Sequence, residues 1–214
     1  MFIDDIKKEM KWIIFVIAYM ILTAISGTLL NDGLVMFLTI NMFLAGVAYT
    51  LTYVVKYINE NYKKKWLLVL ATCLWVIFYP NMIYITSDFI HLQNYSFFEI
   101  YGQTYVYQIS NWYVLFIILL GTVLSASLGM RSIDKIFNVW QIKKYKYYYL
   151  AALFILSSIG IYIGRFIRLN SWQVYRVDII FNEILSQFGF FIGFVTIFVM
   201  IHYIYYFIHN KKHV

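Results

Sequence analysis

Six apolar stretches, each about the length that a helix needs to cross a lipid bilayer, constrain this chain more than any other feature. They cover residues 12–30, 34–55, 66–85, 112–130, 147–164 and 188–208, and a bilayer core about 30 Å thick needs roughly 20 helical residues. Because 63% of the residues are apolar and 13% charged, a water-soluble globule could not hide this much apolar surface. The stretches also lack the alternating polarity of barrel strands. We therefore predict an all-α fold, a polytopic integral membrane bundle of six transmembrane helices in a single domain, 1–214.

The basic residues predict how these helices are oriented. Fourteen of the 17 lysine and arginine residues fall in the N-terminal arm, the second and fourth loops and the C-terminal tail, whereas the first and third loops have none. By the positive-inside rule, both termini are cytoplasmic. A net charge of +7 would suggest nucleic acid as the partner of a soluble protein. Here the charges flank helices beside an anionic leaflet, so the lipid bilayer is the expected partner and nucleic acid is not.

The outer end of the third stretch carries the first group of candidate residues. Pro80 removes a backbone donor and is expected to kink or end the helix. Beyond it, Asp88 and His91 would share one helical face, and Asn81 and Tyr84 would lie in a stripe with Asp88. A histidine oriented by a carboxylate can act as a general acid or base. Two ligands are too few for a zinc site, so we predict no metal, and the sequence identifies no cofactor.

The outer end of the fifth stretch carries two arginines one turn apart, Arg165 and Arg168. Anchors that set topology belong on the opposite face, so these two need another explanation. Planar guanidinium forks suit phosphate or carboxylate. One interpretation is that they bind an anionic ligand such as a lipid phosphate. The alternative is a structural ion pair with Asp88 or another outer carboxylate, and the sequence leaves both open.

Polar and small residues inside the stretches are expected to join helices to one another. Asn41 and His202 lie within spans and predict interhelical hydrogen bonds. Glycine and serine also recur at four-residue spacing, which lets helix backbones approach closely. Internal packing is the expected use of these residues, with a dimer interface as the alternative; they are Gly121, Ser125 and Gly129, then Gly160 and Gly164, then Gly189 and Gly193.

Three strings of the sequence, VIFYPNMIYITSDFIHL, NWYVLFIILLGTVLSASLGMRSI and IGIYIGRFIRLNSW, resemble a bacterial family of polytopic membrane proteins named domain of unknown function 1361. The resemblance covers roughly residues 66–200 and implies a bacterial cytoplasmic membrane protein, without implying a reaction. The family's motif residues correspond here to Pro80, Asn81, Asp88, His91, Gly164, Arg165, Arg168, Asn170, Ser171 and Trp172. The chain departs from the family pattern at Ile83, Ser87 and Gln173, where proline, threonine and aspartate are common.

Three functions are compatible with these patterns. In the first, an outer-face pocket binds or processes an anionic lipid or envelope intermediate, with His91 and Asp88 catalytic. The ligand would then be bound by Arg165, Arg168, Asn170, Asn81 and Trp172. In the second, the chain is a non-enzymatic accessory subunit that packs against another membrane protein. The third, a small-solute transporter, would need polar groups near the midplane, where the sequence is nearly bare.

Overall fold

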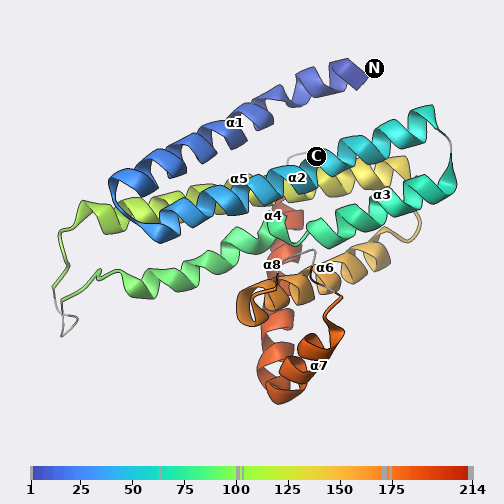
Figure 1. Ribbon diagram of the computed structural model, residues 1–214. Helices are drawn as coiled ribbons and strands as arrows, with labels where there is room; N and C mark the ends of the chain where they lie inside the picture. Colours follow the sequence, from blue (N-terminus) through green and yellow to red (C-terminus); the bar gives the residue numbers. More distant parts are fainter. Residues whose placement is uncertain are drawn as a thin grey trace.

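The computed structural model describes residues 2–62, 64–99, 102, 104–169, 173 and 175–211, with residues 2–9 as backbone only. Within this part every regular element is helical, and one isolated bridge pairs Phe98 with Tyr105. The elements are α1 (Phe2–Leu29), α2 (Gly33–Asn61), α3 (Lys65–Phe78), α4 (Asn81–Tyr84), the 3-10 helix η1 (Ile85–Asn94), α5 (Ile109–Val139), α6 (Lys146–Tyr162), the π-helix η2 (Ile163–Ile167), α7 (Val177–Ser186) and α8 (Phe188–Lys211) (Figure 1).

Six helical segments of the described chain are long and apolar enough to cross a membrane. They are Met10–Leu29, Gly33–Asn61, Lys65–Asn94, Ile109–Val139, Lys146–Ile167 and Phe188–Lys211. All six contain the stretches expected from the sequence, or nearly all of each, so the prediction of an all-helical fold with six span-length helices is confirmed. Several helices continue beyond the expected ends into polar sequence, because a helix needs no apolar residue once it leaves the lipid.

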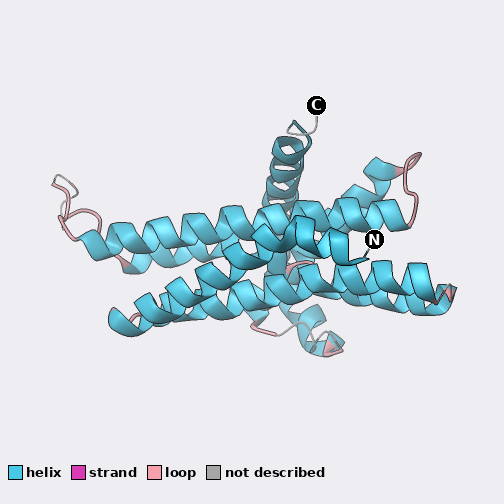
Figure 2. Ribbon diagram, turned by 90° about the horizontal axis from the view of Figure 1, so that it is seen from above, coloured by secondary structure: helices cyan, strands magenta, loops and turns pink. Residues whose placement is uncertain are grey.

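The helices are not all aligned. In Figures 1 and 2, α1, α2, α3 and α5 run side by side, whereas α8 lies across their common direction. The core forms between α2 and α5, which contact each other and most of the remaining helices. Charge patterning identifies the side on which a loop lies but not the tilt of a helix, so the crossing of α8 could not be expected from the sequence.

The third span is divided at Pro80, as the sequence predicts. Helix α3 ends at Phe78, and Pro80 stands immediately before α4, where its missing N–H removes no hydrogen bond from the helix. After Tyr84 the chain tightens into η1, which continues to Asn94. The third loop is therefore shorter than expected from the sequence, because its first residues complete the span. The fifth loop also contains regular structure that was not expected, since η2 and α7 occupy much of it.

Candidate functional site

The candidate site is built around a buried ion pair between Asp88 of η1 and Arg165 of η2. The Asp88 side chain has no exposed surface, and that of Arg165 is 9% exposed. Arg165 Nη2 donates to Asp88 Oδ1, and Asn41 Nδ2 donates to Asp88 Oδ2 at 2.8 Å. Both carboxylate oxygens therefore have a donor. A charged group buried in this way is stable only when it is paired, which is the arrangement seen here.

The guanidinium of Arg165 is held by further contacts. Its Nε and Nη2 donate to Ser87 Oγ at 3.0 and 2.6 Å, and Ser87 Oγ in turn donates to the carbonyl of Tyr84 at 2.7 Å. The Cζ atom of Arg165 lies 4.6 Å from the centroid of the Tyr84 ring, a cation–π contact. We use the term polar cluster for Asn41, Tyr84, Ser87, Asp88, His91 and Arg165.

His91 joins the cluster through Arg165 and not through Asp88. Its Nε2 lies 2.8 Å from Arg165 Nη1 and 4.0 Å from Asp88 Oδ1. Because a guanidinium only donates, Nε2 accepts and the proton of a neutral imidazole is on Nδ1. The sequence predicts that Asp88 orients His91 directly, but in the structure the guanidinium lies between them. His91 is also the outermost member, with 35% of its side chain exposed.

The 3-10 conformation of η1 explains how its side chains meet. A 3-10 helix has three residues per turn, so side chains three positions apart are stacked directly above one another. Asp88 and His91 are therefore aligned along one edge of η1. In an α-helix the same spacing would rotate the two apart by roughly 60°. The sequence spacing predicts the pairing, and the 3-10 geometry tightens it.

The last turns of α6 bring Arg165 to the cluster by a close approach to the third span. A Cβ on Gly160 would lie 2.6 Å from Pro80 Cγ, and one on Gly164 would lie 3.0 Å from Tyr84 Cε2. Neither position has room for a larger residue at this separation. The expectation that these glycines serve internal packing is confirmed.

The π-helix η2 follows directly and carries Arg165. An inserted π-turn shifts the register of the side chains on a helix and is often found at functional sites. Aromatic rings support it on the side of α8, where Phe166 packs edge-on against Phe190 and Phe194 with ring centroids 5.0 and 5.1 Å apart. The turn is therefore fixed by packing on both sides.

The cluster lies deeper than the sequence suggests. Asn41 is eight residues after the start of α2, which places it about 12 Å along the helix from that end. Because Asn41 bonds to Asp88, the carboxylate is at a similar depth, and Arg165 meets it from a position two residues before the end of the fifth span. An ionisable pair within a span-length helix is rare and is a functional candidate by default.

Comparison with known proteins now bears on this arrangement. The profile of the family described as protein of unknown function DUF1361 matches residues 40–208. The chain belongs to this family. No curated protein and no solved structure matches the chain. Every residue of the polar cluster lies inside the matched range, so the DUF1361 region contains the whole network, whereas α1 lies outside it.

The two arginines of the DUF1361 motif have different environments. Arg165 is buried in the cluster, whereas Arg168 is exposed and ends η2 in the left-handed conformation, with φ 60° and ψ 33°. In the part of the chain that the structure describes, Arg168 has no carboxylate partner. Arg165 therefore has the ion pair with Asp88 that one of the two interpretations expected, and Arg168 does not share it. The guanidinium of Arg165 is therefore bound within the cluster, and that of Arg168 is exposed.

The remaining predicted site residues do not join the cluster in the described structure. Asn81, the first residue of α4, donates to the carbonyl of Phe78 at the end of α3 at 2.8 Å. Asn170 and Trp172 lie outside the described residues. Conversely, the site prediction did not include Asn41 and Ser87, which contact Asp88 and Arg165 directly. In the sequence, the role of Asn41 was indicated only by its amide side chain, which stands within an otherwise apolar span.

The chemistry of the cluster does not favour a metal. The described residues contain no group of three or more histidine, cysteine, aspartate and glutamate side chains able to hold an ion. The Asp88 carboxylate already has a guanidinium as its cation, and His91 Nε2, the nitrogen that would bind a metal, accepts from the same guanidinium. The cluster can instead present the Nδ1–H of a neutral His91 imidazole at its exposed edge, and the exposed Arg168 follows Arg165 by three positions.

Proposed function

We propose that this DUF1361 protein is a multi-pass protein of the bacterial cytoplasmic membrane with both termini on the cytoplasmic side. Support comes from the lysines and arginines at the start of α1, α3 and α6 and at the end of α2, α5 and α8. The opposite ends of these helices have few basic residues. Lysine and arginine concentrate in cytoplasmic loops because translocating them is unfavourable.

We further propose that the outer edge of the polar cluster recognises the phosphate of an anionic lipid or envelope intermediate. Arg168 would contact the phosphate, and His91 would donate its Nδ1–H beside it. Arg165 acts as a positioning residue, because its donors are directed to Asp88, Ser87 and His91. The observation that carries this proposal is the exposed guanidinium of Arg168 at the non-basic end of the helices, next to a fixed network. A planar guanidinium fork there suits two oxygens of a phosphate.

A second function has one observation in its favour. The cluster satisfies its own charges, since both oxygens of Asp88 have donors within the chain. An accessory subunit that needs only a stable fold would have the same network and no ligand. The two proposals differ in whether Arg168 binds anything.

The test uses a soluble phosphate monoester, glycerol phosphate, as the probe, so that acyl chains have no part in binding. In a ³¹P NMR titration of the purified protein in detergent, we expect the wild type to broaden and shift the phosphate signal and the Arg168→Gln variant to lose most of that effect. Arg176→Gln removes another exposed arginine from the same loop and serves as the matched control. Equal titrations of the wild type and Arg168→Gln would favour the accessory subunit.

A further inference from the structure

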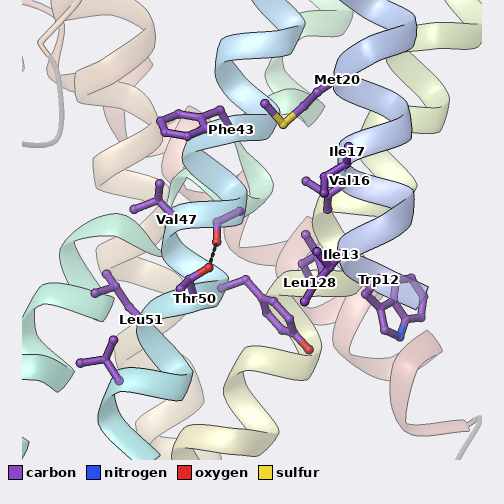
Figure 3. A pocket seen from close by; sticks show the side chains of 13 residues that line it. Trp12, Ile13, Val16, Ile17, Met20, Phe43, Val47, Thr50, Leu51 and Leu128 are labelled. Carbon is purple, nitrogen blue, oxygen red and sulfur yellow. Dashed lines mark hydrogen bonds between the residues drawn. The ribbon is translucent and has the colours of Figure 1, made fainter. Parts of the chain in front are cut away.

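A second feature, which shares no lining residue with the polar cluster, is an apolar groove on the surface formed by α1 and α2. Its volume is about 310 Å³, and its walls include Val16 and Met20 of α1, Phe43, Val47 and Val54 of α2, and Leu128 of α5 (Figure 3). The groove opens to the surroundings of the helices, because Phe43 is 54% and Val54 41% exposed. Two of its lining residues on α2 carry hydroxyls, Tyr49 and Thr50, and that of Thr50 donates to the carbonyl of Gly46 at 2.9 Å. The other α2 and α5 side chains of the lining are apolar, so the groove presents a mainly hydrocarbon surface.

The groove lies in one half of the bundle, as its position along each of three helices shows. On α2 it runs from Phe43 to Val54, from near the midpoint of the helix towards its basic end. On α1 it runs from Met20 back to Trp12, again towards the lysine-bearing end. The contribution of α5, Leu128, lies past the midpoint of that helix on the same side. The length along α2 is about 16 Å, which is roughly half the thickness of a bilayer core.

The end of the groove near the basic helix termini carries positive charge. Trp12 closes this end, at the lower right of Figure 3. Arg131 Cζ lies 4.3 Å from the centroid of the Trp12 ring, and Lys11 Nζ lies 5.9 Å from it. Arg131 follows Leu128 by three positions, so both lie on the face of α5 that meets α1. Tryptophan and basic side chains at the end of an apolar groove match the boundary between acyl chain and headgroup.

From these contacts we infer that the groove is a binding site for an anionic phospholipid of the leaflet at the basic ends of the helices. An acyl chain would lie between α1 and α2, from Phe43 to Trp12, and the phosphate would lie beside Lys11 and Arg131. The hydrocarbon walls account for binding of the acyl chain. The two cations account for the preference for an anionic headgroup, worth about fivefold in affinity for each basic side chain near the surface. This site is separate from the proposed outer phosphate site and does not depend on it.

The experiment is native mass spectrometry of the purified protein with equal amounts of dioleoyl phosphatidylglycerol and dioleoyl phosphatidylcholine. We expect the wild type to retain phosphatidylglycerol in preference to phosphatidylcholine. Thr50→Phe places a ring in the groove and should reduce retention of both lipids several-fold, whereas Thr50→Val, with nearly the same volume as threonine, should not. Thr50 is exposed, so both variants are compatible with the packing of the helices.

The charge is tested separately from the groove. Arg131→Gln should abolish most of the preference for phosphatidylglycerol while chain binding remains, and Arg131→Lys, which keeps the charge, should preserve it. Lys65→Gln removes an exposed lysine at the start of α3, outside the groove lining, and should leave the preference unchanged. The inference is overturned if the wild type retains both lipids equally, or if Thr50→Phe leaves retention of phosphatidylglycerol unchanged.

Discussion

Asp88 and Arg165 are 77 positions apart in the chain and form an ion pair in which the carboxylate is completely buried. The pair joins the third span to the fifth at about the depth of Asn41, eight residues after the start of α2. Each partner has a hydrogen bond to a further polar side chain, Asn41 or Ser87. Because an isolated charge at this depth would be strongly unfavourable, the two residues act as a unit.

The first prediction concerns this unit. Arg165→Gln or Asp88→Asn alone should lower the free energy of unfolding by about 3–5 kcal/mol, because each leaves a buried charge without its partner. The double variant Asp88→Asn with Arg165→Gln should be more stable than either single variant. Thermal unfolding in detergent measures all three. The exposed Arg168→Gln is the control and should change stability little. Additive losses in the double variant would show that the two residues do not stabilise the fold as a pair.

Much of this cluster was predictable from local sequence. Asp88 and His91 have a spacing that joins side chains in an α-helix and in a 3-10 helix alike, and Pro80 indicated the break before them. The approach of Arg165 to Asp88 followed from the position of both near the same ends of their helices. The family's motif spacing pointed to the same residues.

Other features could not be predicted, for reasons of tertiary structure. The burial of Arg165 and the exposure of Arg168 depend on the π-turn η2, and the sequence spacing did not indicate which of the two arginines would pair with Asp88. The role of Asn41 depends on which face of α2 meets η1, which hydrophobicity does not specify when most of a helix is apolar. The axis of α8 depends on its packing against α6, since apolar residues cover it on all sides.

The second prediction concerns the glycines that bring α6 to the third span. Gly160→Ala should destabilise the protein by about 1–3 kcal/mol, because the new Cβ would overlap the rigid ring of Pro80. Gly193→Ala is the matched control, since its Cβ would meet no described atom within 4 Å. Alanine there should be neutral or stabilising by up to about 1 kcal/mol, because glycine is unfavourable in a helix. The measurement is again thermal unfolding in detergent. Similar stabilities for the two variants would contradict the close contact between Gly160 and Pro80.

The third prediction concerns pH and a hydrogen bond just beyond the third span. Tyr95 Oη donates to Asp32 Oδ2 at 2.7 Å, and Asp32 also caps α2 by accepting from the backbone of Leu34 and Val35. Burial, and then the hydrogen bond to Asp32, raise the pKa of Tyr95 above its usual value near 10. The folded state therefore keeps this proton after the unfolded state has released it, and stability should fall as pH rises above about 10.

Tyr95→Phe isolates this contribution. The variant should be less stable than the wild type near pH 8, by about 1 kcal/mol, because it loses a hydrogen bond to a carboxylate. The difference between the two should become smaller as pH increases above 10. Unfolding midpoints measured at several pH values test this. A difference that stays constant up to pH 11 would show that the Tyr95 phenol does not titrate differently on folding.

The fourth prediction concerns topology. In a variant whose single cysteine, Cys73, is replaced by alanine, new cysteines in loops and near helix ends report which side of the membrane they occupy. A membrane-impermeant reagent added to intact cells should label Gln93→Cys but not Asn61→Cys or Gln141→Cys. Asn210→Cys, near the end of α8, should also be protected if the C-terminus is cytoplasmic. If Asn210→Cys were labelled while the other three variants behaved as expected, the first five spans would keep their predicted orientation, but the C-terminus would not be cytoplasmic.

The last prediction concerns His202, which links α8 to α6 in the core. Its Nδ1 lies 2.7 Å from the carbonyl of Phe198 and its Nε2 lies 2.9 Å from Ser157 Oγ. A carbonyl only accepts, so Nδ1 carries the proton and Nε2 accepts from the serine. Ser157→Ala removes the only donor to Nε2 in the described structure and should lower stability by about 1–2 kcal/mol.

Replacing His202 should lower stability less than replacing Ser157. In His202→Phe the ring keeps its packing against Phe154, and the hydroxyl of Ser157 can turn to a carbonyl of its own helix, as serines in helices commonly do. Adding Ser157→Ala to His202→Phe should then cost less than Ser157→Ala in the wild type. A double-mutant cycle by unfolding in detergent measures this coupling, and ¹⁵N NMR of the imidazole identifies the protonated nitrogen. A proton on Nε2 would reverse the direction of the hydrogen bond and contradict the expected asymmetry.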